Sequence, residues 1–500
     1  MSAQRIVIIG AGMGGLTAGL ELAHQGLEVH IVDKAGAPGG KLREVAVGDA
    51  KIDAGPTVFT MRWIFEALFS AVGERLEDHL SLAPMQILAR HAWDAKQRLD
   101  LYADMQRSHE AIAAFAGGAE ADRYVAFCRQ AQKTYQALDT SFMRDSRPSL
   151  TQLISRVTRE DPRGLMHITP FASLWRALGK YFKDPRLQQL FGRYATYCGS
   201  SPFLAPATLM LIAHVEQEGV WMVDGGMARI PEALAKLAQA RGARLHSGVA
   251  VQEILVKGGR ACGVLLDNGE RLEADAVISN TDYAALAAGH YGASLRTSVP
   301  QPQPDQRSLS AITWTLNTRT QGFPLLRHNV FFNGDYAAEF EAIFARGALP
   351  AEPTIYICAQ DRADIDSDPP DGSERLLCLV NAPARGDQRA FDESEVSQCR
   401  SSAQKLLARC GLQLNLDTEA GVMTTPAHFE HLFPASGGGL YGQATHGWQA
   451  SFRRPGARSQ MPGLYLAGGS VHPGAGVPMT SLSGRLAAAA VLQDLTSARR

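Results

Sequence analysis

The pattern of apolar and small residues at the start of the chain predicts a strand, a turn and a helix in direct succession. Residues 5–9 are almost entirely apolar, the glycine-rich segment 10–15 follows, and a helix-like pattern continues to about Gly26. A second apolar run, residues 27–32, ends at the acidic residue Asp33. Short apolar runs bounded by turn residues are typical of buried strands in a parallel sheet. The order strand, helix, strand therefore predicts a βαβ unit that opens an α/β domain.

The glycine-rich turn has the spacing of a dinucleotide-binding fingerprint. Gly10 permits the tight turn, Gly12 and its neighbour Gly14 let a pyrophosphate approach the backbone, and Gly15 allows the helix to pack closely on the strand. Asp33, about 20 residues further on, would accept hydrogen bonds from ribose hydroxyls. Its charge would repel a 2′-phosphate, so NADP is the least favoured nucleotide. The alternative is an ordinary glycine-rich turn of an α/β protein.

The residues after Asp33 favour FAD over NAD. Small residues and cations follow the second strand, where an extended diphosphate could pass, and residues 53–57 add another turn with an accessible backbone. As ordinary loop chemistry these glycines and prolines would only mark turns. The candidate FAD contacts in this part of the chain are Lys34, Gly40, Lys41, Gly55, Pro56 and Thr57.

The far end of the chain repeats the pattern of strand, glycine-rich turn and helix. A short strand is predicted over residues 464–466, a glycine-rich run over 467–479 and a helix through about Leu495. Free amides at such a helix start can bind the flavin pyrimidine and stabilise negative charge on the reduced ring. Segments from opposite ends of the chain would then meet in one site. The candidate contacts here are Gly468, Gly469, Val477, Pro478 and Met479.

Residues 244–280 are predicted to form a β-meander and a returning strand. We expect strands over 245–256 and 261–266, a hairpin turn over 267–269, and the returning strand over 275–279. Val249 could then lie behind the adenine. Asn280 would end the returning strand near the cofactor.

Composition is ordinary for a soluble globular protein. The 500 residues are 45% hydrophobic and 20% charged, which allows two or three domains with ample core. Lys+Arg 49 against Asp+Glu 50 gives no reason to expect nucleic acid as a partner. The 7 cysteines form no C-x-x-C pair, which fits reduced cytoplasmic thiols and indicates neither a disulfide framework nor a metal site. We expect no signal peptide and no membrane-spanning helix.

One stretch, residues 142–193, is basic with interleaved aromatic residues. A basic helix of this kind can lie on an anionic membrane surface. The alternative is a solvated helix face with its aromatic side chains packed inward. The nearby aliphatic run 209–213 is better explained as a buried helix or the wall of a tunnel than as a membrane anchor.

Several further stretches together carry a family resemblance that covers nearly the whole chain. They are residues 53–60, 219–227, 279–282, 437–442 and 472–478, the last reading His-Pro-Gly-Ala-Gly-Val-Pro. With the N-terminal fingerprint, they resemble the flavin amine oxidase and carotenoid desaturase superfamily, and more closely the bacterial carotenoid desaturases of the phytoene desaturase type. The His-Pro-Gly-Ala-Gly core is much more specific to these desaturases than the dinucleotide fingerprint is.

Two short stretches favour one subfamily. Residues 60–63 and 222–224 are similar to the hydroxycarotenoid (methoxyneurosporene) 3,4-desaturases, whereas phytoene desaturases tend to carry a proline and an aromatic-Pro-Arg in those places. Because the chain has one nucleotide fingerprint, a membrane quinone or oxygen is favoured over NAD as the electron acceptor. The resemblance implies FAD and an acyclic hydroxycarotenoid substrate that is desaturated at C3–C4. It also implies a cytoplasmic protein that is peripherally attached to the inner membrane.

The resemblance also implies the fold. We expect an α/β (α+β) protein with a Rossmann-type FAD-binding domain of the glutathione reductase/amine oxidase type and an interleaved mixed-sheet substrate domain. A helical region able to associate with a membrane completes it. The predicted parts are FAD-binding segments at 1–75, 215–290 and 455–500, a substrate and helical membrane-associating region at 76–214, and a substrate domain at 291–454.

Catalysis by such an enzyme needs little acid–base machinery. A hydride leaves an allylic carbon, a proton leaves its neighbour, and the protein mainly supplies alignment and a dry apolar tunnel. His472, in the flavin-proximal turn, is a candidate proton acceptor, although a structural role is the alternative. Arg147 lies where related desaturases place polar active-site groups. Asp53, Asp224 and Asp282 are expected to order loops or contact the ribityl chain.

Three other functions stay open. The first is a phytoene desaturase or another carotenoid desaturase or isomerase. The second is a flavin amine oxidase with a polar substrate and an aromatic-walled site, for which Tyr441 and Trp448 are available. The third is a non-catalytic lipid carrier of the same architecture, which could dispense with a complete flavin site.

Overall fold

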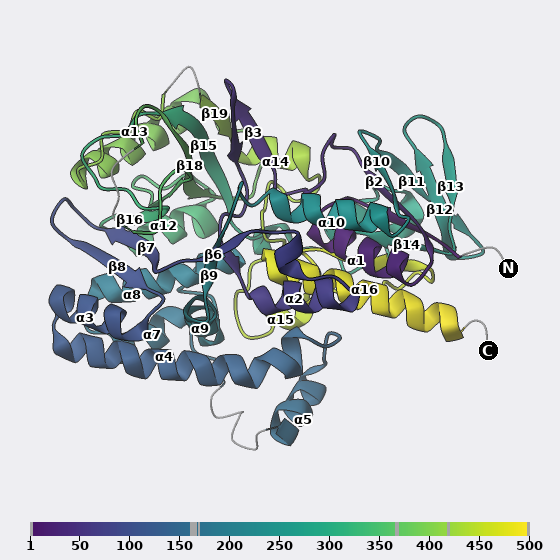
Figure 1. Ribbon diagram of the computed structural model, residues 1–500, viewed down its shortest axis with the longest axis horizontal. Coiled ribbons are helices and arrows are strands. Elements are labelled where there is room, and N and C mark those ends of the chain that lie inside the picture. Colours follow the sequence, from purple (N-terminus) through teal and green to yellow (C-terminus); the bar gives the residue numbers. More distant parts are fainter. Residues whose placement is uncertain (1–3, 161–167, 169–170, 366–369, 418–420, 498–500) are drawn as a thin grey trace.

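A computed structural model describes residues 4–160, 168, 171–365, 370–417 and 421–497. Its first sheet has five parallel strands (Figure 1). Their order across the sheet is β10 (Arg244–Ser247), β2 (Glu28–Asp33), β1 (Arg5–Ile9), β14 (Ala276–Ser279) and β20 (Leu464–Leu466). Because parallel strands run the same way, the loops after all five lie at one edge of the sheet.

Helices cover one face of this sheet and a smaller sheet covers the other. Ile6 and Ile8 of β1 belong to a core shared with α1 (Met13–His24), α2 (Arg62–Ala71), α10 (Arg229–Ala240) and α16 (Val477–Ser497). Val7 and Ile9 point the opposite way, because side chains alternate along a strand. They pack against α11 (Tyr283–Ala288) and the antiparallel strands β11 (Val251–Lys257), β12 (Arg260–Leu266) and β13 (Arg271–Glu273).

A second, seven-stranded sheet is mixed. Its order is β19 (Gly421–Thr424), β15 (Ser310–Thr318), β18 (Glu374–Ala382), β17 (Ile355–Ala359), β16 (His328–Phe331), β7 (Ile87–Ala92) and β8 (Arg98–Tyr102), and only the β16–β7 pairing is parallel. Helix α13 (Glu393–Arg409) packs on one face of it. That helix begins at a capping box in which Asp392 and Glu395 bond each other's backbone amides.

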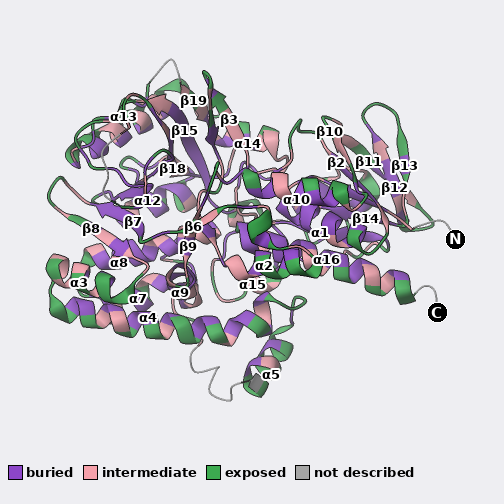
Figure 2. Cartoon of the chain, viewed as in Figure 1, coloured by how far each residue is buried: buried purple, intermediate pink, exposed green. Residues whose placement is uncertain are grey.

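A helical region lies below this sheet in Figure 1, and most of its helices share one core with β7 and β8. The helices are α3 (Met105–Ala116), α4 (Gly118–Leu138), α5 (Leu150–Glu160), α7 (Leu174–Tyr181), α8 (Pro185–Gly192) and α9 (Leu211–Gln217). Among the described residues, no helix is both long and apolar enough to cross a bilayer. Figure 2 shows buried residues concentrated along both sheets and on the inward faces of the helices.

Short elements connect these parts. They are the hairpin β3 (Glu44–Val47) and β4 (Ala50–Asp53), the sheet β5 (Phe59–Thr60), β9 (Val220–Val223) and β6 (Leu82–Pro84), and the helices α12 (Tyr336–Glu341), α14 (Pro426–Leu432) and α15 (Ala450–Arg453). Short 3₁₀ or π turns occupy Leu76–Asp78, Asp139–Met143, Arg193–Cys198, Ala207–Met210, Ala293–Leu295, Pro304–Gln306 and Ala342–Arg346.

The structure corrects the prediction of one strand. The strand expected over residues 245–256 is two strands of different sheets, because Gly248 (φ +73°) turns the chain and its amide donates to Ala35 O at 2.9 Å. In the basic stretch 142–193, the described residues include the helices α5, α7 and α8. Part of this stretch, residues 161–167 and 169–170, lies outside the described residues. The predicted strands 5–9, 261–266, 275–279 and 464–466 are confirmed within about two residues.

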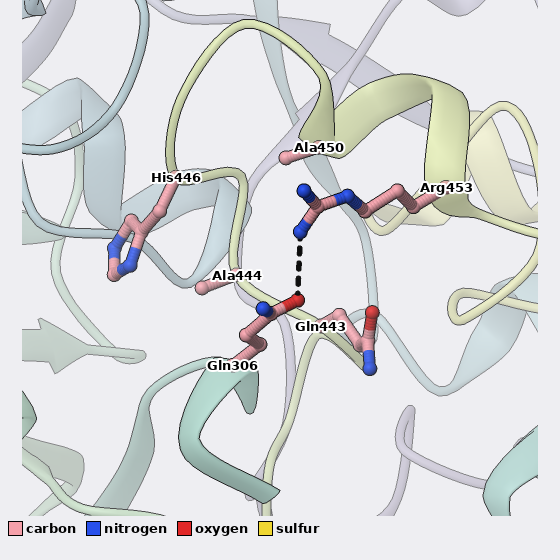
Figure 3. A pocket seen from close by; sticks show the side chains of 6 residues that line it. All are labelled: Gln306, Gln443, Ala444, His446, Ala450 and Arg453. Atoms are coloured by element: carbon pink, nitrogen blue, oxygen red, sulfur yellow. Dashed lines mark hydrogen bonds between the residues drawn. The ribbon is translucent and has the colours of Figure 1, made fainter. Parts of the chain in front are cut away.

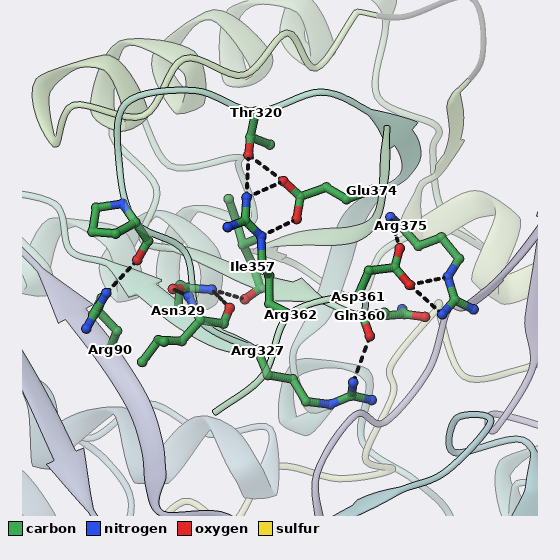
Figure 4. A network of polar contacts seen from close by, with 12 residues as sticks. Arg90, Thr320, Arg327, Asn329, Ile357, Gln360, Asp361, Arg362, Glu374 and Arg375 are labelled. Carbon is green, nitrogen blue, oxygen red and sulfur yellow. Dashed lines mark hydrogen bonds and ion pairs between the residues drawn. The ribbon is translucent and has the colours of Figure 1, made fainter. Parts of the chain in front are cut away.

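Buried ion pairs stiffen the seven-stranded sheet (Figure 4). The Arg362 guanidinium donates to both carboxylate oxygens of Glu374 at 2.7 and 2.8 Å, and both side chains are less than 5% exposed. Arg327 donates to Gln360 O at 2.8 Å beside them. Losing one partner of such a pair leaves an uncompensated buried charge.

We expect Arg362→Met to lower the free energy of unfolding by about 3–5 kcal/mol, because Glu374 would keep its charge without a counterion. Arg389→Met is the matched control, since Arg389 pairs with Glu395 at an exposed position and its loss should cost at most about 1 kcal/mol. Denaturant unfolding of both variants checks this. Equal losses for the two variants would contradict it.

Candidate cofactor site

The loops that follow the strands of the five-stranded sheet are joined by backbone hydrogen bonds. The Gly10 amide donates to the end of β2 at 2.7 Å, Asn280 N donates to Ile9 O at 2.8 Å, and Ala467 N donates to the end of β14 at 2.9 Å. The loops after β2, β1, β14 and β20 therefore stand side by side. In open α/β sheets this edge is where ligands bind.

The two glycine-rich turns from opposite ends of the chain meet there. A Cβ atom built on Gly14 would lie 2.7 Å from Asn280 Oδ1 and 3.0 Å from the amide nitrogen of Gly468. One built on Gly484 of α16 would lie 2.3 Å from Gly14 O. Side chains at these positions would fill the space between α1 and α16. The glycines thus bring both helix N-termini to one edge of the sheet.

Asp33 fixes the first turn from the end of β2. Its carboxylate accepts from Ala11 N at 2.6 Å and from Ala35 N at 2.8 Å. Each carboxylate oxygen keeps a free lone pair that can accept from a ribose hydroxyl. Val249, predicted to back the adenine, donates its amide to Asp33 O at 3.1 Å, and its half-buried side chain packs against the core behind β1.

A second group of predicted contacts lies beside the first turn. Gly40 approaches Gly12 so closely that a Cβ would lie 3.3 Å from Gly12 Cα, and one on Gly55 would lie 1.9 Å from Lys41 O. Lys41 Nζ donates to Leu440 O at 2.7 Å, and burial lowers the pKa of its ammonium. Lys34 instead reaches His431 O at 3.1 Å near the surface.

Thr57 links the predicted flavin edge to the seven-stranded sheet. Its hydroxyl is 2.6 Å from Tyr356 Oη, which is 2.7 Å from His328 Nδ1. Burial, and then the charges of Arg327 and Arg193, lower the pKa of His328 to about 3, so this ring is neutral. The sequence carried no local motif that pointed to Tyr356 or His328.

His472 and Arg147 both make contacts that hold loops together. The His472 ring is 1% exposed, its Nε2 is 3.0 Å from Asp145 O, and burial lowers its pKa to about 4. The Nδ1 atom is buried without a partner among the described residues. Arg147 Nη1 donates to Arg454 O at 3.1 Å. A catalytic role for either residue stays a prediction.

Two of the three aspartates expected to order loops accept hydrogen bonds from backbone amides at the start of a helix. The Asp53 carboxylate accepts from Met227 N at 2.7 Å and Ala228 N at 3.2 Å, which fixes the start of α10. Burial raises its pKa, against the opposing effect of these amides. Asp282 accepts from Ala284 N at 3.0 Å and caps α11. Asp224 is exposed on the rim of a cavity.

Two cavities in the structure are lined mainly by polar side chains. The larger, about 380 Å³, is bordered by Asp53, Asp224, Arg327 and Gln360 among others. The smaller, about 90 Å³, lies beside His446, where Arg453 donates to Gln306 at 3.1 Å (Figure 3). Within the described part of the chain, no cluster of His, Cys, Asp or Glu could hold a metal ion.

The residues present fit an extended dinucleotide. Close protein contacts at Gly14 and Gly55 exclude side chains there, two helix N-termini offer amides, and Asp33 ends β2 where the ribose contact is predicted. The predicted contacts Pro478 and Met479 lie in the first turn of α16, directly after Val477. The edge is continuous from Asp33 to this turn.

Comparisons with known proteins agree with this site. The model of the family described as flavin containing amine oxidoreductase matches residues 13–492. The chain is 53% identical to a hydroxyneurosporene desaturase of Rubrivivax gelatinosus, with 99% of this chain and 95% of that one covered. It is 44% identical to the hydroxyneurosporene desaturase of Cereibacter sphaeroides, with 99% of each covered. A solved putrescine oxidase shares the fold at a TM-score of 0.61 and 13% identity, with 99% of each chain covered.

We expect Asp33→Ala to weaken FAD binding roughly 10- to 100-fold, because it removes the acceptor for ribose and frees the Ala11 amide. Asp49→Ala, at an exposed position of the β3–β4 hairpin, is the control. Flavin fluorescence titration of the stripped protein measures both dissociation constants. Unchanged flavin occupancy in the Asp33 variant would refute the ribose contact.

Proposed function

The chain belongs to the flavin containing amine oxidoreductase family, and we propose that it is an FAD-dependent desaturase acting on C3–C4 of an acyclic 1-hydroxycarotenoid. The observation that carries the proposal is the full-length identity of 53% and 44% to two hydroxyneurosporene desaturases. The two glycine-rich turns that meet at one edge of the five-stranded sheet support it. A phytoene desaturase would desaturate an unhydroxylated substrate instead. The two 3,4-desaturase-like stretches, 60–63 and 222–224, favour the hydroxylated one.

FAD, when bound, supplies the acceptor for the hydride that leaves the allylic carbon. The chain's own residues then have three tasks. The first turn of α16 directs amides toward the flavin pyrimidine, where they favour negative charge. Thr57 and Tyr356, 2.6 Å apart, hold the loop at the flavin edge against the seven-stranded sheet. Apolar side chains around the substrate exclude water.

His472 is our candidate for receiving the proton. It is neutral at physiological pH, since burial lowers its pKa to about 4, and its buried Nδ1 has no partner among the described residues. Its Nε2 is tied to Asp145 O at 3.0 Å, which fixes the ring. Arg147 would act as a positioning residue by holding the same loop to α15 through Arg454 O and Phe452 O.

The long polyene would bind where half-buried apolar and aromatic side chains pack against the core of the helical region. This core also contains the buried residues Met210, Ile212 and Ala213 of the aliphatic run predicted to be buried helix or tunnel wall. The half-buried members include Val58, Trp175, Phe203, Leu209, Leu211, Met222, Tyr356 and Tyr441. They come from elements on both sides of the cofactor edge.

We also propose a peripheral position on the cytoplasmic face of the inner membrane, with a membrane quinone or oxygen as electron acceptor. Helix α5 carries Leu150 and Ile154, each 42% exposed and four residues apart on one face. Phe171, 82% exposed, lies 5.7 Å from the Trp448 ring. Arginines of the same stretch can meet anionic headgroups while these apolar groups enter the interface. Helix α5 stands at the lower edge of Figure 1.

Two other functions have less support. The likeness to putrescine oxidase is one of fold, at 13% identity. A lipid carrier of this architecture would not need close contacts between Gly14, Gly468 and Gly484, which are all present.

We expect FAD-loaded protein in liposomes to shift the absorbance of 1-hydroxyneurosporene to longer wavelength and to leave phytoene unchanged, because each new double bond extends the conjugated system. Absorbance spectra and product chromatography measure this. Turnover of phytoene alone would overturn the choice of substrate. Turnover of a polyamine without carotenoid turnover would favour an amine oxidase.

We expect the double variant Ile154→Ser and Phe171→Ser to bind anionic liposomes at least about tenfold more weakly, since each apolar side chain contributes about 1.5–3 kcal/mol on burial. Val422→Ser, at an exposed site in β19, is the control. Liposome sedimentation measures binding. Equal binding of the double variant and the wild type would remove these residues from the membrane surface.

A further inference from the structure

Arg193 is an interior arginine that has no carboxylate partner in the described part of the chain. It begins the turn Arg193–Cys198, directly after α8, and its chain neighbours Phe191, Tyr194 and Ala195 are at most 2% exposed. Among the described residues, the one hydrogen bond of its guanidinium runs from Nη2 to Tyr197 Oη, at a long 3.4 Å, and its Nε has no acceptor. A guanidinium has five N–H donors, and leaving them unpaired away from water is costly.

The nearest carboxylate is already committed to other donors. Tyr194 Oη donates to Glu216 at 2.6 Å and Tyr197 Oη donates to it at 2.5 Å. Glu216 therefore offsets the charge of Arg193 without binding it, and the cluster as a whole stays close to neutral. This arrangement leaves the donors of Arg193 for a group that the protein itself does not supply.

The side chains around Arg193 share a core with the predicted flavin edge, since Tyr194, Tyr197, Tyr356 and Val58, the chain neighbour of Thr57, all belong to one hydrophobic cluster. Burial and, second to it, the charge of Arg193 lower the pKa of His91 to about 3. The charge of Arg193 also lowers the pKa of His328. His328 bonds Tyr356, which bonds Thr57 at the predicted flavin edge. Arg193, Tyr197 and Tyr356 are only half-buried although they stand among fully buried residues.

We propose that Arg193, supported by Tyr197 and Glu216, forms the subsite that binds the hydroxyl oxygen of the substrate. This inference rests on the proposed function. In a 1-hydroxycarotenoid the hydroxyl carbon is two bonds from C3, so its subsite must lie beside the flavin rather than at the far end of a tunnel. The link through His328, Tyr356 and Thr57 meets that requirement.

The same subsite explains how a hydroxylated substrate would be selected. The guanidinium donates to the hydroxyl oxygen and thereby sets the register of C3–C4 against the flavin. A hydrocarbon without the hydroxyl would cover the donors of Arg193 and leave them unpaired. Sites built to bind a hydroxyl reject the analogue that lacks it for this reason.

The test compares kcat/KM for 1-hydroxyneurosporene and for neurosporene, which lacks the hydroxyl. We expect Arg193→Gln to lower the value for the hydroxylated substrate roughly 10- to 100-fold, the effect of one hydrogen bond to a charged group, and to change the other less than about threefold. Arg193→Lys keeps the charge and should retain part of the preference. Arg186→Gln is the matched control, because Arg186 lies in the adjacent α8 and pairs with Asp184.

Equal losses for both substrates in the Arg193 variants would overturn the subsite and show a structural role. Flavin retention reports whether each variant is folded. Binding of the two carotenoids, followed by quenching of tryptophan fluorescence, separates this inference from the proposed function. A wild-type protein that desaturates neither carotenoid refutes the function, whereas the subsite fails if binding shows no preference for the hydroxylated carotenoid or if Arg193→Gln leaves that preference intact.

Discussion

The close approach of α1 and α16 is the constraint on which the rest of the site depends. Gly14 contacts Gly484 and the backbone at Gly468, and Thr17 and Ser481 bring their hydroxyls to 3.0 Å between the same helices. Any side chain larger than hydrogen at Gly14 or Gly484 would separate the helices. Their contact puts two helix N-termini, from opposite ends of the chain, at one edge of a parallel sheet. A ligand with phosphates at one end and an electron-accepting ring at the other needs such an edge.

A second constraint joins this edge to the seven-stranded sheet. Asp53 exchanges two hydrogen bonds with Gln360, at 3.0 and 2.8 Å, while its carboxylate fixes the start of α10. Thr57, four residues later, bonds Tyr356 of β17. One short loop therefore contacts α10 and two neighbouring segments of the larger sheet.

The interior beside the cofactor edge combines apolar walls with a few neutral or compensated polar groups. His91, His328 and His472 are all held neutral by burial, with pKa values near 3 or 4. Glu216 accepts hydrogen bonds from Tyr194 and Tyr197, and Tyr197 in turn accepts one from Arg193. A site of this kind suits hydride removal from a hydrocarbon, since fixed charges would otherwise bind water. Such a site would also discriminate strongly between substrates with and without a single hydroxyl.

Local pattern determined much of this protein from the sequence alone. The strands 5–9 and 464–466, the glycine turns and Asp33 were predictable because their geometry depends on residues adjacent in the chain. The division of residues 244–257 into two strands at Gly248 was not predictable, since the two strands differ only in which sheet each one joins. Arg193, Glu216, Tyr356 and His328 lie on four separate elements and share no spacing. Only the tertiary structure brings them together, because burial and charge pairing arise from packing between elements and not from neighbours along the chain.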